Sequence, residues 1–309
     1  MKKCYFAVLA LVLSIFAAPV QAQTDEIYDF SGFDTKAMLD LFYKVHQDGR
    51  YYPTLEEFEA IGIQQSDIAF VRSHVRRAQI MDRADRLVPS TYETRNLWTN
   101  FPMDVGSGGS AGYPSDKFAA DVFSMWQYVN LFGSWNHSFF QAPGAWVDAA
   151  HRNGSDIFSG IAFFESWTGD GDATYSAMIT QKDANGEFIY VKPLIHCLMY
   201  FGADGINYNW EDNSYSNADI VAFHKALYKY AKEVGFNNYD SAIYTAVNGL
   251  ATYNLSTANA LLGNSEGQTH ALMLNYSNGD FTGAYQMQQS VQVAEQTLGT
   301  TEDLYTGVW

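Results

Sequence analysis

The chain has 309 residues, which is enough for one large domain with a full hydrophobic core. Its formal net charge of -16 disfavours binding to nucleic acid and to anionic lipid, because both would be repelled by a negative field. Aromatic residues make up 16% of the sequence, and such rings can fill a core or stack on the apolar faces of sugars.

Residues 1–22 have the order of an export signal. Lys2 and Lys3 precede a short apolar run, and the small-residue end Val20-Gln21-Ala22 follows it. The run is shorter than the roughly 20 residues that a transmembrane helix needs, and no later stretch is long enough either. We therefore expect no membrane span and a mature protein that is secreted or lies in the periplasm or cell envelope. Cys197 would then be its single cysteine, which excludes an intramolecular disulfide.

Residues 23–95 are predicted to form an N-terminal helical segment that packs beside the main domain. Apolar residues recur at helical spacing from Ala37 to Val45, and Thr54-Leu55-Glu56-Glu57 is typical of a capping box that opens a second helix. Five arginines between Arg72 and Arg86 predict a third helix with a solvated or salt-bridged face.

Residues 96–309 alternate short apolar runs with helical segments, which indicates repeated βα units. Residues 106–112 read as a Gly/Ser-rich loop. Seven strands are expected, near residues 97–103, 126–133, 157–164, 205–210, 242–247, 271–276 and 304–309. Helices are expected between them, for example at 143–151, 192–201, 218–234 and 286–298. The predicted fold class is α/β, a catalytic (β/α)8 TIM barrel that is truncated after about seven strands.

The stretch 204–211, Asp-Gly-Ile-Asn-Tyr-Asn-Trp-Glu, carries the clearest chemical signal. Alternate residues of a strand share a face, so Asn207, Asn209 and Glu211 would face the barrel interior, with Glu211 at the carboxyl rim where barrel enzymes keep their chemistry. A shielded carboxyl there can stay protonated and donate to a leaving-group oxygen. Ordinary retaining glycosidases need a second carboxylate, and this row ends in only one. Asn209 could instead hold the 2-acetamido group of an N-acetylglucosamine ring, whose own carbonyl oxygen then attacks.

Several segments around this strand resemble glycoside hydrolase family 85, and the Asn209/Glu211 pair falls on that family's catalytic Asn and Glu. The similar segments are residues 126–132, 134–137, 143–154, 160–165 and 201–205. The resemblance implies an endo-β-N-acetylglucosaminidase that cleaves the β-1,4 bond of the N,N'-diacetylchitobiose core of N-glycans. It also implies retention of configuration, with Asn209 steering the acetamide and Glu211 as the acid/base. Its partners would be N-glycans of glycoproteins or related N-acetylglucosamine oligosaccharides.

The same resemblance implies substrate-binding residues on other strands. Tyr244 is similar to a family tyrosine that contacts the acetamido group, and Asn275 and Tyr276 are similar to an Asn-Tyr pair on the sixth strand. The tryptophans that usually follow that pair are absent here. Asp104 lies in a segment similar to a first-strand pattern of the family, although the family's histidine is replaced.

Two further candidates follow from strand position alone. Glu165 ends the third predicted strand, where it could line the cleft, and Trp135 is either a platform for a sugar ring or part of the core. No His or Cys lies at metal-ligand spacing, and His151 ends a predicted helix, where the helix dipole favours it. We therefore predict no metal and no cofactor.

Two alternative functions stay open at this point. A family 18 chitinase or endoglycosidase carries Asp-Gly-x-Asp-x-Asp-x-Glu on its fourth strand, whereas this chain has Asn207 and Asn209 at the second and third Asp positions. A glycan-binding protein without turnover would also account for the absent tryptophans and eighth strand. Because Trp309 falls inside or just after the seventh predicted strand, we expect a truncated or interrupted version of a longer protein, with impaired activity.

Overall fold

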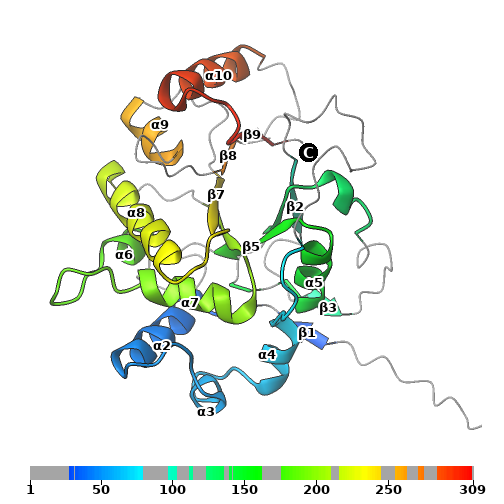
Figure 1. The fold of residues 1–309 in the computed structure, drawn as a ribbon, viewed down its shortest axis with the longest axis vertical. Helices are drawn as coiled ribbons and strands as arrows, with labels where there is room; N and C mark the ends of the chain where they lie inside the picture. Colours follow the sequence, from blue (N-terminus) through cyan, green and yellow to red (C-terminus); the bar gives the residue numbers. More distant parts are fainter. Residues whose placement is uncertain are drawn as a thin grey trace, which may run out of the picture.

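The fold is a parallel barrel wrapped by helices, seen in a computed structural model (Figure 1). The structure describes residues 28–30, 32–78, 97–102, 111–113, 123–135, 139–140, 142–161, 175–209, 216–244, 255–262, 271–274 and 284–307. Seven strands form one sheet in chain order, and every neighbouring pair in it is parallel. They are β2 (Trp98–Pro102), β4 (Leu131–Trp135), β5 (Asp156–Ile161), β6 (Gly205–Asn209), β7 (Asp240–Tyr244), β8 (Ala271–Leu274) and β9 (Leu304–Thr306).

The sheet curls until its two edge strands, β2 and β9, come close together. Trp98 on β2 and Tyr305 on β9 make an edge-to-face ring contact with centroids 5.6 Å apart. The described strands β2 and β9 are not paired through their backbones, so side chains bridge this gap. The prediction of a TIM barrel with about seven strands is thereby confirmed.

Helices follow the strands and cover the outside of the barrel. They are α5 (Gly144–Arg152), α6 (Tyr175–Thr180), α7 (Val191–Phe201), α8 (Asn217–Glu233), α9 (Leu255–Leu262) and α10 (Ala284–Leu298). The chain leaves α7 through Gly202, whose φ of +92° lies in the left-handed region that favours glycine, and it enters β6 three residues later. In the described part of the chain, no helix combines the length and apolar character that a bilayer crossing needs.

The N-terminal helices are α2 (Thr35–Gln47), α3 (Leu55–Glu59) and α4 (Gln65–Val71). They pack on the outer helices of the barrel, α2 and α3 against α7 and α4 against α5 (Figure 1). The apolar face of α2 is buried in the same core as α7. The predicted capping box is present, since Thr54 accepts from the backbone N–H of Glu57 and the Glu57 carboxylate accepts from the backbone N–H of Thr54.

The predicted arginine-lined third helix is wrong. Helix α4 ends at Val71, and the described residues 72–78 are extended. Their backbone N–H groups bond carbonyls of distant helices instead of a helix of their own. Ser73 N–H donates to the carbonyl of Phe201 on α7, and Ala78 N–H donates to that of His151 on α5. Residues 79–96, with Arg83 and Arg86, lie outside the described part.

Two smaller expectations also need correction. The predicted strand at 126–133 begins too early, because Trp126–Tyr128 is a 3-10 turn, η4, whose tryptophan packs against Phe132 of β4. The predicted loop 106–112 runs into β3 (Ala111–Tyr113), which pairs antiparallel with β1 (Tyr28–Phe30). Strands of three residues are too short to leave a readable alternation, and these two partners lie far apart in sequence.

Candidate active site

The strand β6 directs its asparagines into the barrel. Asn207 is in register with Ala242, and Asn209 with Tyr244, on the neighbouring strand β7. Residues in register on parallel neighbours point to the same side of a sheet. Ala242 and Tyr244 belong to the cluster of side chains that fills the barrel interior. Asn207 and Asn209 therefore face the interior, which is the orientation that alternation along the strand predicts.

Asn209 is the last described residue of β6, at the carboxyl end of the strand. Its side-chain oxygen Oδ1 is buried, and it has no hydrogen-bond partner among the described residues. Tyr244, its neighbour in register on β7, is buried at 4% exposure. A buried amide oxygen without a donor is costly, by about 1–3 kcal/mol, and such groups mark places where a ligand can donate. This end of β6 therefore offers an acceptor beside an aromatic wall.

Packing on the opposite face of β6 fixes the position of Asn209. Ile206 and Tyr208 are fully buried in the core between the sheet and the helices. The ring of Tyr208 meets the ring of His224 on α8 edge to face, with centroids 5.4 Å apart. Burial raises the pKa of the Tyr208 hydroxyl and lowers the pKa of His224 to about 4, so both groups are neutral at pH 7.

The start of β6 is held by a close approach that only glycine permits. A Cβ atom added to Gly205 would lie 2.1 Å from the carbonyl oxygen of Asp240 and 2.9 Å from the ring of Phe158. Phe158 lies in register with Gly205 on β5 and fills the space that a side chain would need. This contact fixes the packing of β5, β6 and β7 at the amino-terminal ends of these strands.

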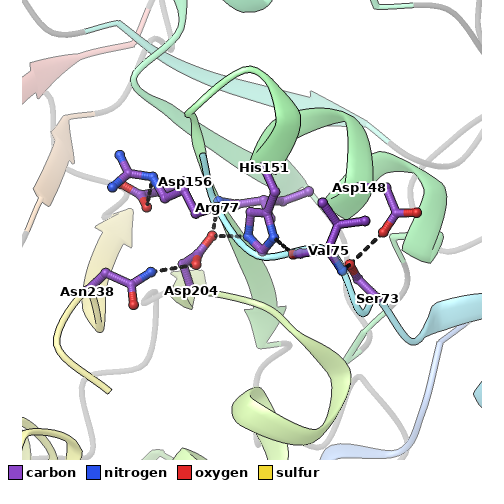
Figure 2. Close-up of polar contacts among 9 residues, drawn as sticks. Ser73, Val75, Arg77, Asp148, His151, Asp156, Asp204 and Asn238 are labelled. Atoms are coloured by element: carbon purple, nitrogen blue, oxygen red, sulfur yellow. Dashed lines mark hydrogen bonds and ion pairs between the residues drawn. The ribbon is translucent and has the colours of Figure 1, made fainter. Parts of the chain in front are cut away.

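Asp204, immediately before β6, is the centre of a buried polar cluster at the amino-terminal ends of the strands (Figure 2). It is 3% exposed, and its carboxylate accepts three hydrogen bonds. The donors are the backbone N–H of Ile157 at 2.9 Å, Nε2 of His151 at 2.8 Å and Nδ2 of Asn238 at 2.6 Å. Asp204 thus joins β5, helix α5 and the segment before β7 to the first residue of β6.

His151 extends this cluster to the extended segment 72–78. Its Nδ1 contacts the carbonyl oxygen of Val75, while its Nε2 bonds Asp204. Burial alone would lower the pKa of His151, but the hydrogen bond and charge of Asp204 raise it above the ordinary value. His151 lies in the last turn of α5, as predicted, and its ring also joins Asp204 to the extended segment through hydrogen bonds.

Two more carboxylates lie at this end of the barrel. Burial, and then the charge of Asp204, raise the pKa of Asp156 to about 7, although Nε of Arg77 lies 2.8 Å from its Oδ1. Burial also raises the pKa of Asp240 to about 6, against the hydrogen bonds from Tyr228 and the backbone of Ser241. In barrel enzymes this amino-terminal face serves stability and the opposite face serves chemistry. The cluster is therefore a structural anchor.

The predicted site residues divide between described and undescribed positions. Asn209 and Tyr244 are adjacent in register, and Trp135 is the last residue of β4, in register with Pro102. Asp104, Glu165, Glu211, Asn275 and Tyr276 lie outside the described residues. Each of these five follows the carboxyl end of a described strand in the sequence. Among the described residues, no three His, Cys, Asp or Glu side chains are grouped so that they could hold a metal ion.

Comparison with protein families supplies the assignment that the geometry leaves open. A family model described as glycosyl hydrolase family 85 matches residues 108–308. The chain belongs to glycosyl hydrolase family 85. It is therefore a glycoside hydrolase by family, and this match decides between family 85 and the family 18 alternative. No curated protein matches the sequence.

Comparison with solved structures supports the same fold. The chain is similar to the glycoside hydrolase domain of Endo-D from Streptococcus pneumoniae R6, with a TM-score of 0.59 and 18% identity. The match covers 78% of this chain and 38% of that chain, so this protein spans well under half of its structural relative. A weaker likeness, to a structure titled "Putative alpha Amylase from Salmonella typhimurium", has a TM-score of 0.33 and 11% identity over 76% of this chain and 45% of that one.

Proposed function

We propose that this protein is an endo-β-N-acetylglucosaminidase that hydrolyses the β-1,4 bond in the N,N'-diacetylchitobiose core of N-glycans. The observation that carries the proposal is the buried, unpartnered amide oxygen of Asn209 at the carboxyl end of β6, beside Tyr244. A 2-acetamido group brings an N–H donor of the kind that this oxygen lacks. Membership of family 85 supports the same substrate class.

The proposed reaction has two steps and leaves the anomeric configuration unchanged. In the first, Asn209 holds the acetamido group so that its carbonyl oxygen attacks the anomeric carbon. The bond from that carbon to the glycosidic oxygen breaks, and Glu211 gives its proton to the departing oxygen. In the second, the Glu211 carboxylate takes a proton from water while the water oxygen bonds to the anomeric carbon, and the bond from that carbon to the acetamido oxygen breaks. One N-acetylglucosamine stays on the protein, and the rest of the glycan is released.

The residue type at position 209 favours this route over one with two carboxylates. An asparagine cannot form a glycosyl ester, whereas its amide can orient a neighbouring amide. The side chain of Tyr244 supplies an apolar wall that would exclude water from the acetamido group. The export signal that the sequence predicts at residues 1–22 is consistent with action outside the cytoplasm, on glycoproteins in the envelope or the surroundings of the cell.

The deciding experiment is mass spectrometry of an N-glycosylated protein before and after incubation with the enzyme. We expect a product that keeps a single N-acetylglucosamine at each cleaved site. Asn209→Ala should abolish release while the variant still hydrolyses a supplied sugar oxazoline, because the second step does not need the asparagine to start the attack. A protein that retains glycans but releases none would be the non-catalytic binding alternative, and a covalent glycosyl ester on a carboxylate would exclude the assisted mechanism.

A further inference from the structure

The turn between α2 and α3 presents two adjacent tyrosines to solvent on the outer wall of the barrel. Tyr51 is 61% exposed and Tyr52 is 41% exposed. Both follow Arg50 and precede Pro53, a buried residue just before the capping box of α3. This turn lies outside α7 (Figure 1), whereas Asn209 faces the barrel interior. The two places are therefore on different sides of the barrel wall.

Each exposed ring is supported from behind by an aromatic side chain of α7. Tyr51 stacks on the imidazole of His196 with centroids 4.7 Å apart and an interplanar angle of 22°. Tyr52 leans on Tyr200 with centroids 5.5 Å apart. The guanidinium of Arg72 lies 3.9 Å from the centre of the Tyr200 ring. The two tyrosines are exposed and yet fixed in place.

The backbone that carries the two rings is also braced. Arg50 donates to both carboxylate oxygens of Glu57, at 2.9 Å and 2.6 Å, and the backbone N–H of Thr54 donates to the same carboxylate at 2.8 Å. His46 Nε2 lies 3.3 Å from the carbonyl oxygen of Tyr51. The Arg50 and Thr54 contacts lower the pKa of Glu57 to about 2, so this brace persists into acid. A surface fixed before binding loses little entropy when a ligand arrives.

The size and charge of this surface select the class of ligand. Two tyrosine rings at these exposures offer on the order of 200 Å², far below the roughly 800 Å² that each side of a stable protein interface buries. A formal charge of -16 disfavours anionic polymers. Neutral sugar rings fit both limits, since they present a small apolar face to an aromatic ring. A hydroxyl group that could bond a sugar lies near, since the Tyr230 hydroxyl hydrogen-bonds His196, on which Tyr51 stacks. Burial, and then Tyr51 and Glu233, raise the pKa of Tyr230 to about 12, so this hydroxyl keeps its proton at neutral pH.

We propose that Tyr51 and Tyr52 form a second binding surface for neutral sugar rings of N-glycans, on the outer wall of the barrel and separate from the catalytic end of β6. This inference rests on the proposed function for its choice of glycan. Such a surface would hold a second branch, or a second glycan of the same glycoprotein, while another is cleaved. Release from a crowded glycoprotein would then depend on the two rings, whereas release from a short glycopeptide with one glycan would not.

Hydrogen–deuterium exchange locates the binding directly in the full-length protein carrying Glu211→Gln, which leaves the glycan uncleaved. The probe is a soluble N-glycan released from a glycoprotein. We expect protection at the turn 48–54 and along α7, in addition to protection around β6. Tyr51→Ala with Tyr52→Ala should remove only the first set and weaken retention on immobilised N-glycan roughly tenfold.

Matched variants make the result specific. Tyr128 is 43% exposed in η4, away from this turn, so Tyr128→Ala should keep both sets of protection. Tyr51→Phe with Tyr52→Phe keeps the rings and should keep the binding. Protection at β6 alone, or equal loss in the Tyr128 variant, overturns the second surface and leaves the proposed function intact. Equal protection of the turn by the source glycoprotein after its N-glycans have been removed also overturns it. Protection of the turn in the Glu211→Gln protein, together with no glycan release by the wild-type protein, would refute the proposed activity instead.

Discussion

Asp156→Asn should stabilise the protein at alkaline pH and do much less at acidic pH. The folded protein raises the pKa of this carboxyl from 3.8 to about 7. A carboxyl whose pKa is raised on folding favours the fold while it is protonated, so its contribution is complete below pH 3.8 and is lost as the pH rises to about 7. Asparagine mimics the protonated carboxyl at every pH.

The structure sets the size of the effect. The rise to about 7 corresponds to about 4 kcal/mol of unfolding free energy, of which about 3 kcal/mol accumulates above pH 5. The side chain is 26% exposed and Arg77 keeps part of its charge compensated, so solvent screening reduces the expected gain to about 1–2 kcal/mol between pH 5 and pH 8.

Urea unfolding of wild type and Asp156→Asn at pH 5 and pH 8 measures this difference. The gap between the two proteins should widen in favour of the variant as the pH rises. Arg77→Gln supplies the opposite control, since it removes the cation that partly offsets the burial of Asp156 and should cost more stability at pH 8 than at pH 5. A variant that is less stable than wild type by the same amount at both pH values would show that the ion pair with Arg77 outweighs the burial of Asp156.

Three further predictions follow, two on the anchoring of β6 and one on buried histidines of α7 and α8. Gly205→Ala should destabilise the protein by about 2 kcal/mol or more, because the added Cβ would clash with the carbonyl oxygen of Asp240. An unchanged thermal unfolding temperature would contradict this contact. Asp204→Ala should cost about 3–5 kcal/mol in urea unfolding, since it leaves the buried His151 without its partner, and a loss below about 1 kcal/mol would mean that the cluster is solvated. Burial lowers the pKa of His196 and of His224 to about 4, so the fold keeps their contribution above pH 6.5 and loses it as the pH falls toward 4; thermal unfolding of His196→Gln should show a shallower loss over that range.

Local sequence signals predicted the parts of the fold that local interactions decide. The side chains of strand β6 alternate between the core under the helices and the barrel interior, which a period of two makes readable, and its described bounds, Gly205–Asn209, lie within the predicted 205–210. Helix α8 begins one residue before its predicted start, with Ser216 as its cap. The capping box at Thr54 is fixed by residues three apart and was therefore visible in the sequence.

The parts that the sequence did not reveal depend on distant partners. The extended segment 72–78 exchanges helical hydrogen bonds for bonds to Phe201 and His151, which lie far along the chain. The bond between His151 and Asp204 spans 53 residues, and nothing in either local pattern indicates it. Trp126 also depends on a distant partner. Its apolar neighbours in sequence predict a strand, whereas Trp126 lies in the 3-10 turn η4 and its ring packs against Trp146 of α5.

The two ends of β6 show why a partnered polar group and an unpartnered one call for different interpretations. At the amino-terminal end the Asp204 carboxylate is buried and accepts from three donors, so a ligand would have to displace protein contacts to reach it. At the carboxyl end the Asn209 oxygen is buried and has no donor among the described residues. Burial is common to both, and hydrogen-bond satisfaction separates them. A strand fixed at one end by satisfied charges holds the unsatisfied amide at the other end in a constant position, which the proposed mechanism requires if the acetamido group is to attack its own anomeric carbon.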